Sequence, residues 1–248
     1  MSAQIITVAV IKGGTGKTTT CAALAQAAAA ENKKVLAIDL DPQANLTTCL
    51  GADRAYLGAW YLFDRLPENV IDEVIQPTAQ NIDVIAGSPT LADVMTEKNS
   101  IYRLEAAISP VLKRYDLIII DTPPFLCELT YNALQASNNL LIVCDTDLGS
   151  LNGMYYLLDI AKEVKRTNKK LKVLGSVITR YNSRPKINKY IHDVIAEQGA
   201  ARKCPLIAEI RQGIAIQEAQ AYRKSIFEYA PKSNPAIDYM KLYKTICK

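Results

Sequence analysis

Residues 11–19 read Ile11-Lys12-Gly13-Gly14-Thr15-Gly16-Lys17-Thr18-Thr19, and they follow the β-branched apolar run Ile5–Ile11. An apolar strand that enters a glycine-rich loop and then a helix is the setting of a phosphate-binding loop, because glycines let backbone N–H groups turn inward around the phosphates. The dipole of the next helix, expected over Thr18–Ala30, favours the same negative charge. This stretch therefore predicts a strand–loop–helix unit that binds a nucleotide.

The polar groups of this loop have separate expected tasks. Lys17 should reach the β- and γ-phosphates, the Thr18 hydroxyl should ligate Mg²⁺, and Thr19 can donate a hydrogen bond to the α-phosphate. The predicted ligands are ATP and Mg²⁺, which makes the chain a candidate ATPase. The residues that should surround the phosphates are Lys12, Gly13, Gly14, Thr15 and Gly16.

The rest of the chain alternates short apolar runs with longer amphipathic stretches. The further runs expected as strands are Val35–Asp39, Ile82–Ala86, Leu117–Asp121, Leu140–Cys144 and Val173–Thr179. Helical patterns cover Thr18–Ala30, Ile101–Arg114, Met154–Lys165 and Lys186–Gln198. Near-continuous apolar strands indicate burial on both faces. We therefore predict one α/β domain over residues 1–248, a mostly parallel twisted sheet with helices on both faces and its site at the carboxyl ends of the strands.

The composition argues against several other classes of protein. At 248 residues, of which 49% are hydrophobic, the chain can bury a large core. Six cysteines without a CxxC pair and a single histidine, His192, suggest neither a zinc site nor a disulfide framework. The sequence shows no signal region and no apolar run of roughly 18 residues. We expect a soluble cytoplasmic protein.

Acidic residues stand at two of the predicted strand ends. Asp39 and Asp41 have the alternate spacing that places them on the same side of one strand end, and Asp121 closes another strand. Asp41 is expected to orient the attacking water, and Asp39 to lie near Thr18 and the metal shell. Asp121 should hold Mg²⁺. Acids at a strand end can also merely cap the next helix.

Three motifs together resemble one family. The loop lacks the usual first glycine, since Ile11 stands there, and it opens with a second lysine, Lys12. It resembles the deviant Walker A loop, KGGxGK[ST], of the ParA/MinD family of partition and positioning ATPases. Residues 39–47 resemble the family's switch I, and residues 117–124 its Walker B and switch II. The resemblance implies that Lys12 reaches the nucleotide of the opposite subunit in a homodimer, and that Pro123 helps to stiffen the turn that senses the γ-phosphate.

The same resemblance suggests where the base binds, within a region over residues 177–232. Thr179 follows a strand at the place where the family meets adenine, and a loop around Glu209, Ile210 and Arg211 should close the other side. Asp147 falls near an acid that can meet the signature lysine in family members. A plain helix-capping acid is equally expected there.

Two features favour the ParA branch over the MinD branch. Asp41 is followed by Pro42 and Gln43, and residues 218–239 resemble the ParA pattern xEAxxxxxxIxxYxPxSxxAxDY. A C-terminal helix is expected over residues 234–247. Its apolar stripe fits packing on the domain, which we favour, although a membrane-surface helix has a similar pattern.

Basic residues concentrate in the second half of the chain. Residues 1–124 hold 10 Lys and Arg against 14 Asp and Glu, and residues 125–248 hold 19 against 11. This asymmetry indicates a polyanionic partner or an anionic membrane, although a solvated basic face has the same signature. Residues 162–172 are interpreted as a solvated helix end. Because non-specific DNA binding needs only Lys and Arg near phosphates, the candidates are Arg180, Arg184, Lys186, Lys189, Arg202, Lys203, Arg211, Arg223 and Lys224.

These observations lead to one hypothesis and two alternatives. A ParA-like partition ATPase would form an ATP-dependent homodimer, bind DNA non-specifically on the nucleoid, and hydrolyse ATP slowly until a ParB-like protein stimulates it. No stable membrane association is expected in that case. The first alternative is a MinD-like positioning ATPase on the membrane surface. The second is a metabolic enzyme on the same scaffold, although we find no cysteine pattern for a bridging iron–sulfur cluster and no extra substrate domain.

Overall fold

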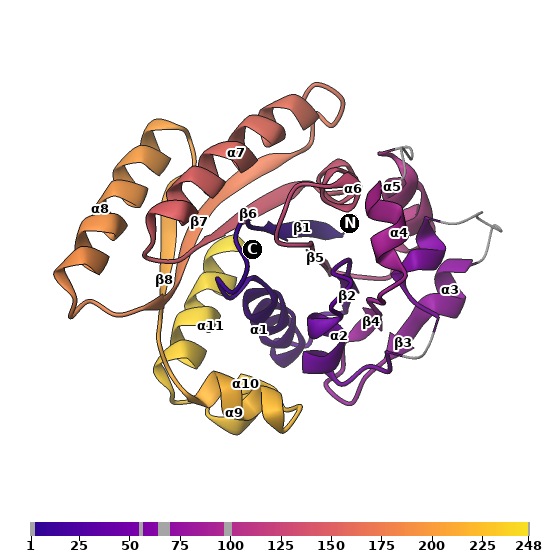
Figure 1. The fold of residues 1–248 in the computed structure, drawn as a ribbon. Coiled ribbons are helices and arrows are strands. Elements are labelled where there is room, and N and C mark those ends of the chain that lie inside the picture. Colours follow the sequence, from indigo (N-terminus) through magenta and orange to yellow (C-terminus); the bar gives the residue numbers. More distant parts are fainter. Residues whose placement is uncertain (1–2, 55–56, 64–69, 97–100, 248) are drawn as a thin grey trace.

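The structure is a computed structural model that describes residues 3–54, 57–63, 70–96 and 101–247. The described residues form an eight-stranded sheet in the order β3-β4-β2-β5-β1-β6-β7-β8, with helices on both faces (Figure 1). Neighbouring strands are parallel, except that β3 and β4 run antiparallel. The predicted α/β fold with a mostly parallel sheet is therefore confirmed.

The bounds of the elements follow the apolar pattern of the sequence. The strands are β1 Gln4–Ala9, β2 Val35–Asp39, β3 Ile75–Pro77, β4 Asp83–Ile85, β5 Leu117–Asp121, β6 Asn139–Cys144, β7 Lys172–Tyr181 and β8 Leu206–Arg211. The α-helices are α1 Lys17–Ala30, α2 Asn45–Leu50, α3 Val70–Val74, α4 Leu91–Thr96, α5 Arg103–Ile108, α6 Glu128–Ala136, α7 Leu148–Val164, α8 Lys186–Ala201, α9 Ala215–Ala221, α10 Ile226–Tyr229 and α11 Asn234–Ile246.

Hydrophobic side chains of the central strands alternate between two faces of the sheet. Ile6 and Val8 of β1 belong to a core that includes α1 and α11, whereas Ile5 belongs to a core with α5 and α6 on the other face. A third core joins β6 and β7 to α7 and α8. Figure 1 shows α1 and α11 on one side of the sheet and α5, α6 and α7 on the other. The strand ends thus remain free to carry polar loops.

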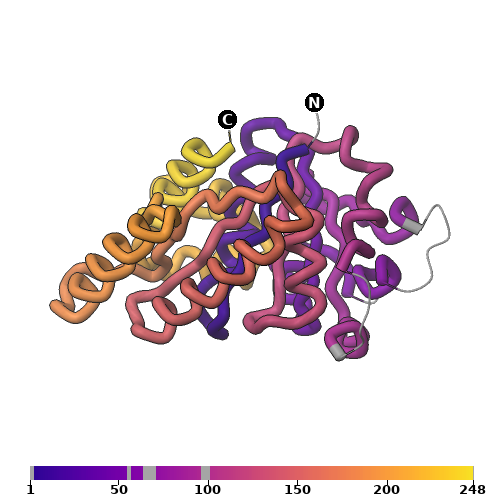
Figure 2. Tube along the Cα trace, turned by 90° about the horizontal axis from the view of Figure 1, so that it is seen from above, coloured from indigo at the N-terminus to yellow at the C-terminus, as the bar shows by residue number. Residues whose placement is uncertain are grey.

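The C-terminal helix α11 packs on the domain. Tyr239, Leu242 and Tyr243 are buried in the core that contains α1, and the Tyr239 hydroxyl lies 3.1 Å from Thr20 Oγ1. The Gln4 side chain donates to the carbonyl of Ile246 at 2.8 Å, so the start of the first strand lies beside the end of the last helix, and Figure 2 shows both termini on the same side of the molecule. Among the described residues, no helix is long and apolar enough to span a membrane.

Two local predictions differ from the structure. Residues 206–211 form the edge strand β8, whereas a loop is expected around Glu209 from the sequence. The strand is not recognisable in the sequence, because a half-exposed strand lacks a continuous apolar run. The helix expected over Ile101–Arg114 is shorter: α5 ends at Ile108 and a 3₁₀ turn follows over Ser109–Val111. Pro110 has no N–H and interrupts the α-helical bonding there.

Strand β7 requires a glycine beside an irregularity in its pairing with β6. Gly175 has a φ of +146°, and a Cβ at this position would collide with the carbonyl oxygen of Pro205. The register between β6 and β7 shifts next to it, between Leu140 and Leu141. Gly175 therefore lets β7 fit between its neighbours and end at the correct place for Thr179.

We predict that Gly175→Ala lowers the free energy of unfolding by about 2–4 kcal/mol, because backbone strain and a steric clash add. Gly51→Ala is the matched control: Gly51 has a φ of +77°, but a Cβ there would meet no neighbouring heavy atom within 4 Å, so only the strain of about 1 kcal/mol applies. Urea unfolding followed by circular dichroism measures both. Equal losses in the two variants would contradict the clash.

Candidate nucleotide-binding site

A pocket of about 720 Å³ opens at the carboxyl ends of the parallel strands. The loop between β1 and α1 forms its floor, and Asp41 lies at its side. Thr179 lines it near the end of β7, residues 210–214 line it at the end of β8 and just beyond, and Tyr239 of α11 completes the wall. This is the edge at which parallel α/β sheets place their ligands. Strands far apart in sequence thus meet at one site.

The phosphate-binding loop depends on two glycines with left-handed backbone. Gly14 has a φ of +75° and Gly16 a φ of +84°, a conformation that L side chains rarely adopt. A Cβ on Gly16 would lie 3.2 Å from Thr179 Oγ1, so the loop also packs tightly on the end of β7. The same Thr179 hydroxyl donates to the carbonyl of Thr15. Sequence and packing together fix the loop at the helix N-terminus.

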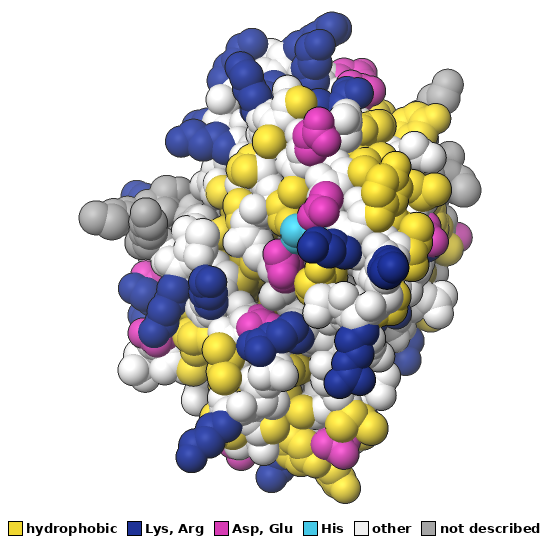
Figure 3. All heavy atoms as spheres, turned by 90° about the vertical axis from the view of Figure 1, so that its left-hand side faces the viewer, with side chains coloured by type: hydrophobic (Ala, Val, Ile, Leu, Met, Phe, Trp, Pro, Cys, Tyr) yellow, Lys and Arg dark blue, Asp and Glu magenta, His cyan; other side chains and the backbone are white. Residues whose placement is uncertain are grey.

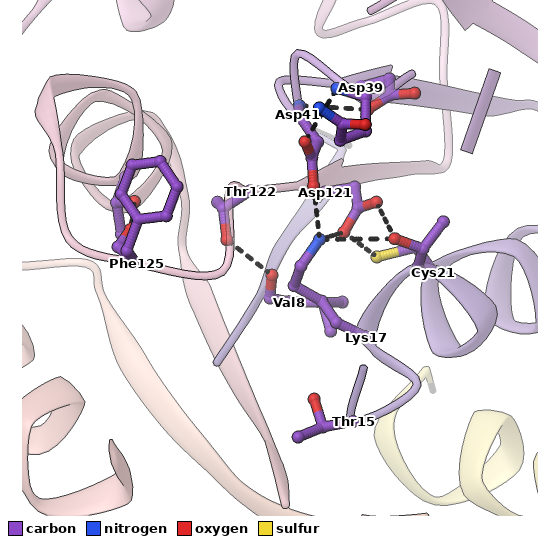
Figure 4. Close-up of polar contacts among 12 residues, drawn as sticks. Val8, Thr15, Lys17, Cys21, Asp39, Asp41, Asp121, Thr122 and Phe125 are labelled. Atoms are coloured by element: carbon purple, nitrogen blue, oxygen red, sulfur yellow. Dashed lines mark hydrogen bonds and ion pairs between the residues drawn. The ribbon is translucent and has the colours of Figure 1, made fainter. Parts of the chain in front are cut away.

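Lys17 points into the pocket from the first turn of α1, between two acids (Figure 4). The residue is only 5% exposed; its ammonium forms an ion pair with Asp121 and lies 4.0 Å from Asp41. Burial disfavours its charged form, but the charge of Asp121 and its hydrogen bond, together with the smaller contributions of Cys21 and Asp41, outweigh burial and raise the pKa of Lys17 above its ordinary value. Lys17 therefore stays a cation, as phosphate binding requires.

Thr18 and Asp121 supply hard oxygen donors beside this lysine. The Thr18 hydroxyl donates to Asp121 at 2.7 Å. A hydroxyl and a carboxylate fit Mg²⁺, which keeps several waters and takes other ligands from the phosphates of its substrate. The described part of the chain holds no cluster of three or more His, Cys, Asp or Glu side chains suited to a metal.

Asp39, at the end of β2, lies beside Asp121 of β5 in the register of the sheet. Its carboxylate accepts hydrogen bonds from the Thr47 backbone at 2.9 Å, from the Thr47 hydroxyl at 2.7 Å and from the Asp41 backbone at 3.1 Å. Complete burial, and then the nearby charge of Asp121, raise the pKa of Asp39 to about 7. Both oxygens are thus engaged in holding residues 41–47, and a role for Asp39 near Thr18 and the metal shell stays a prediction.

Asp41 has one oxygen fixed and one turned toward the pocket. The backbone N–H of Gln43 donates to one carboxylate oxygen at 3.0 Å, and the other lies 4.0 Å from the Lys17 ammonium. The residue is 6% exposed and lines the pocket. A carboxylate held in this way can accept a hydrogen bond from a water molecule without rearranging.

Lys12, the second lysine of the loop, points away from Lys17 toward the start of α7. Its ammonium lies 3.3 Å from Asp145 and 3.0 Å from Asp147. Asp147 is also the N-cap of α7 and accepts the N–H of Gly149 at 2.7 Å. Asp147 therefore both contacts the signature lysine and caps a helix, the two roles expected for it. Asp145 also pairs with Arg180 at 3.2 Å. Sequence reasoning missed Asp145, because only the tertiary fold brings it to Lys12.

The residues expected around the base are only partly available to it. Thr179 lines the pocket, but its hydroxyl is used by the Thr15 carbonyl. Arg211 also lines the pocket, while its guanidinium donates to Asp238 at 2.8 and 2.7 Å. Pro123 is buried, and Pro124 lines the pocket in its place, because successive residues of an extended chain point to opposite sides. The sequence did not indicate Gln217 and Gln220, which also line this side.

The candidate DNA-binding residues are exposed but lie in separate places. Arg184, Lys186 and Lys189 are at the start of α8, on the pocket side of the sheet. Arg202 and Lys203 are at the opposite end of α8, where Arg202 stacks on the Tyr155 ring at 4.0 Å. Arg223 and Lys224 are in the turn between α9 and α10, whereas Arg180 and Arg211 form ion pairs with Asp145 and Asp238.

We predict that Lys17→Ala weakens the binding of a fluorescent ATP analogue about 10- to 100-fold, because hydrogen bonds to charged groups contribute about 1.5–3 kcal/mol. Lys33→Ala, an exposed lysine outside the pocket, is the control and should bind as the unaltered chain does. Fluorescence titration measures both affinities. Unchanged affinity in Lys17→Ala would show that this pocket does not hold the phosphates.

Comparison with known proteins agrees with this geometry. A protein-family model described as an AAA domain matches residues 3–173. The chain is 32% identical over 250 residues to the sporulation initiation inhibitor protein Soj of Bacillus subtilis, with 98% of each chain covered. It is 31% identical over 252 residues to the chromosome partitioning protein ParA of Myxococcus xanthus, covering 99% of this chain and 88% of that one.

A solved structure shares the fold over the same length. The septum site-determining protein MinD of Pyrococcus horikoshii, complexed with Mg-ADP, superposes with a TM-score of 0.80 at 25% identity and covers 99% of this chain and 96% of that one. The two sequence relatives each exceed 30% identity over nearly the whole chain. The chain therefore belongs to the ParA/MinD family of P-loop ATPases.

Proposed function

We propose that the protein is a DNA-partition ATPase. Mg-ATP joins two copies at their nucleotide pockets, the dimer binds DNA non-specifically on the nucleoid, and slow hydrolysis stimulated by a ParB-like protein releases it. The cargo is a plasmid, a chromosome or a mobile element. The names of two relatives, a chromosome partitioning protein and Soj, support this function.

The observation that carries the proposal is the contrast between the two lysines of one loop. Lys17 is buried inside its own pocket, whereas the Lys12 side chain is 34% exposed and points to the outer side of the loop. Its partners Asp145 and Asp147 are partly and largely exposed, with 14% and 54% of their side chains accessible. Such ion pairs are weak and exchangeable. Lys12 is therefore free to leave them for the phosphates of a second copy.

The chemistry follows from the positions of the acids and lysines. Asp41 orients a water molecule toward the γ-phosphorus, while the bond to the β–γ bridging oxygen breaks. Lys17, together with Lys12 of the second copy, balances the negative charge that develops on the phosphate oxygens. Thr18 and Asp121 would hold Mg²⁺, which supplies further charge neutralisation when bound. Since the site is complete only in the dimer, hydrolysis and dimer lifetime are coupled.

Two observations favour DNA over a membrane surface as the partner of the dimer. Most of the apolar stripe of α11 is directed into the core, with Tyr239, Leu242 and Tyr243 buried and Ile237 exposed, so it offers little apolar surface to lipid. Arg184 and Lys186, with Lys189 one turn further along α8, are exposed on the pocket side of the sheet. Lys and Arg near phosphates are what non-specific DNA binding requires.

We predict that Asp41→Ala abolishes hydrolysis and leaves a stable ATP-bound dimer on DNA, because the nucleotide contacts remain while the water loses its orienting carboxylate. Size-exclusion chromatography with light scattering, and DNA retention in ATP and in ADP, measure the two effects. Asp41→Asn is the matched variant that preserves the acceptor for Gln43 N–H. It should slow hydrolysis without disturbing residues 41–47.

A different pair of results would refute the partition function. An Asp41→Ala chain that stays monomeric in ATP and binds DNA no better than in ADP would contradict the proposed dimer switch. ATP-dependent sedimentation with anionic liposomes, in the absence of DNA retention, would assign the protein to membrane positioning instead. A salt series in both assays separates the two partners.

We also predict that Asp145→Asn combined with Asp147→Asn increases ATP-dependent dimerisation about two- to thirtyfold. Each exposed ion pair contributes about 0.2–1 kcal/mol, and losing these pairs releases Lys12. Arg180→Gln is the control, because it removes the other partner of Asp145 but leaves both Lys12 pairs. Analytical ultracentrifugation at several protein concentrations gives the dimer dissociation constant of each variant. Weaker dimerisation of the double variant would mean that the acids assist the dimer rather than restrain it.

A further inference from the structure

A cluster of positive charge lies outside the nucleotide pocket, at the junction of α7 and β7. Residues 162–172, here called the basic turn, contain a single acid, Glu163. All the cations of the basic turn are exposed, and among the described residues none of them forms an ion pair. They are Lys162, Lys165, Arg166, Lys169, Lys170 and Lys172.

Buried residues hold the backbone of the basic turn in place. The Asn168 side-chain nitrogen lies 3.0, 3.0 and 2.6 Å from the carbonyl oxygens of Leu134, Gln135 and Ser137, at the end of α6. Asn168 also accepts the N–H of Lys170 at 3.1 Å, and Leu171 is buried in the core between β6 and α7. The cations are thus presented on a fixed backbone, which lowers the entropy cost of binding a ligand.

The basic turn lies at the amino-terminal ends of the strands, opposite the nucleotide pocket at their carboxyl ends. It precedes β7, whereas the pocket lies where the strands end. The 17 residues of α7 run between these two sides, a distance of roughly 25 Å at 1.5 Å per residue. Figure 1 shows this end of α7 at the top, and Figure 3 shows Lys and Arg side chains gathered at the top of the adjoining face. Nucleotide binding therefore does not involve the basic turn directly.

The chemistry of the basic turn fits a phosphate polymer. Favourable interaction with the dipole of α7 accounts for a cation or two in its last turn, but not for cations that continue through residues 169–172. The apolar members, Val164 and Leu171, are both buried, so no side chain is available to insert into a lipid surface. Duplex nucleic acid offers one negative charge per roughly 1.7 Å along its axis. That density matches a series of exposed cations on a rigid support.

We propose that the basic turn is a second contact surface for the phosphate backbone of DNA, independent of bound nucleotide. This inference rests on the proposed DNA-binding function and assigns part of it to residues that the pocket-side candidates do not include. In a dimer joined at the nucleotide pockets, the two basic turns face away from each other. One dimer can then hold two separate DNA segments, and a monomer keeps weak, salt-sensitive DNA binding.

The test compares two variants that lose the same amount of charge. The turn variant carries Lys165→Ala, Arg166→Ala, Lys169→Ala and Lys170→Ala. The control carries Lys33→Ala, Lys34→Ala, Lys113→Ala and Lys241→Ala, all exposed and outside the basic turn. DNA binding is measured without nucleotide and with ATP over a salt series, and DNA-coated beads with ATP-bound protein are used to capture a second, labelled duplex.

The turn variant should lose binding in the absence of nucleotide and capture of the second duplex, but keep the increase caused by ATP. Each lost phosphate contact should reduce the slope of log affinity against log salt by about 0.9. The control should keep both activities. A variant with Lys165→Arg, Lys169→Arg and Lys170→Arg should also keep both activities. This result would show that the turn variant loses binding because it loses charge, not because its fold is disturbed.

Equal behaviour of the turn variant and the control would overturn the second surface while leaving the partition function intact. Absence of DNA binding by the unaltered protein in every nucleotide state would overturn both. Retained DNA capture combined with lost binding to phosphatidylserine vesicles would assign the basic turn to a membrane and would refute the proposal. Thermal unfolding of each variant identifies a loss of fold.

Discussion

The parallel register of three strands governs the rest of the structure. β5 lies between β1 and β2, and this pairing sets Asp121 beside both Val8 and Asp39 at a common edge. Because these strands are buried on both faces, their polar ends can only lie at that edge. The loop after β1 therefore delivers Lys17 directly above two acids. A change of one residue in register would turn the carboxylates away from the lysine.

Local sequence signals explain why the centre of the site was predictable. The glycine-rich loop and the acids after β2 and β5 each combine an apolar run with a polar end, and those strands lie close to the predicted bounds. The edge strand β8 has no such contrast, since most of its residues are half exposed. The partners of Lys12 and Thr179 depend on contacts between β1, β6 and β7. Residue type alone carries no information about such distant contacts.

The site combines groups that are held firmly with one that is held weakly. Thr47 fixes Asp39, and Gln43 fixes Asp41, through backbone N–H groups that side-chain motion does not disturb. Lys12 instead depends on exposed ion pairs, which salt screens and which exchange readily. In a nucleotide-controlled switch this division is useful. In the proposed mechanism, the rigid groups preserve the geometry of the reaction, and the mobile lysine responds to a second copy.

The packing of α11 has a consequence for synthesis of the protein. Tyr239 forms part of the pocket wall, and its hydroxyl contacts Thr20 in the helix that begins at the phosphate-binding loop. On the ribosome the loop is made early and Tyr239 almost last. A growing chain therefore has an incomplete pocket until α11 has left the exit tunnel and docked. In the proposed cycle, such unfinished chains would not pair, because their pocket lacks this wall.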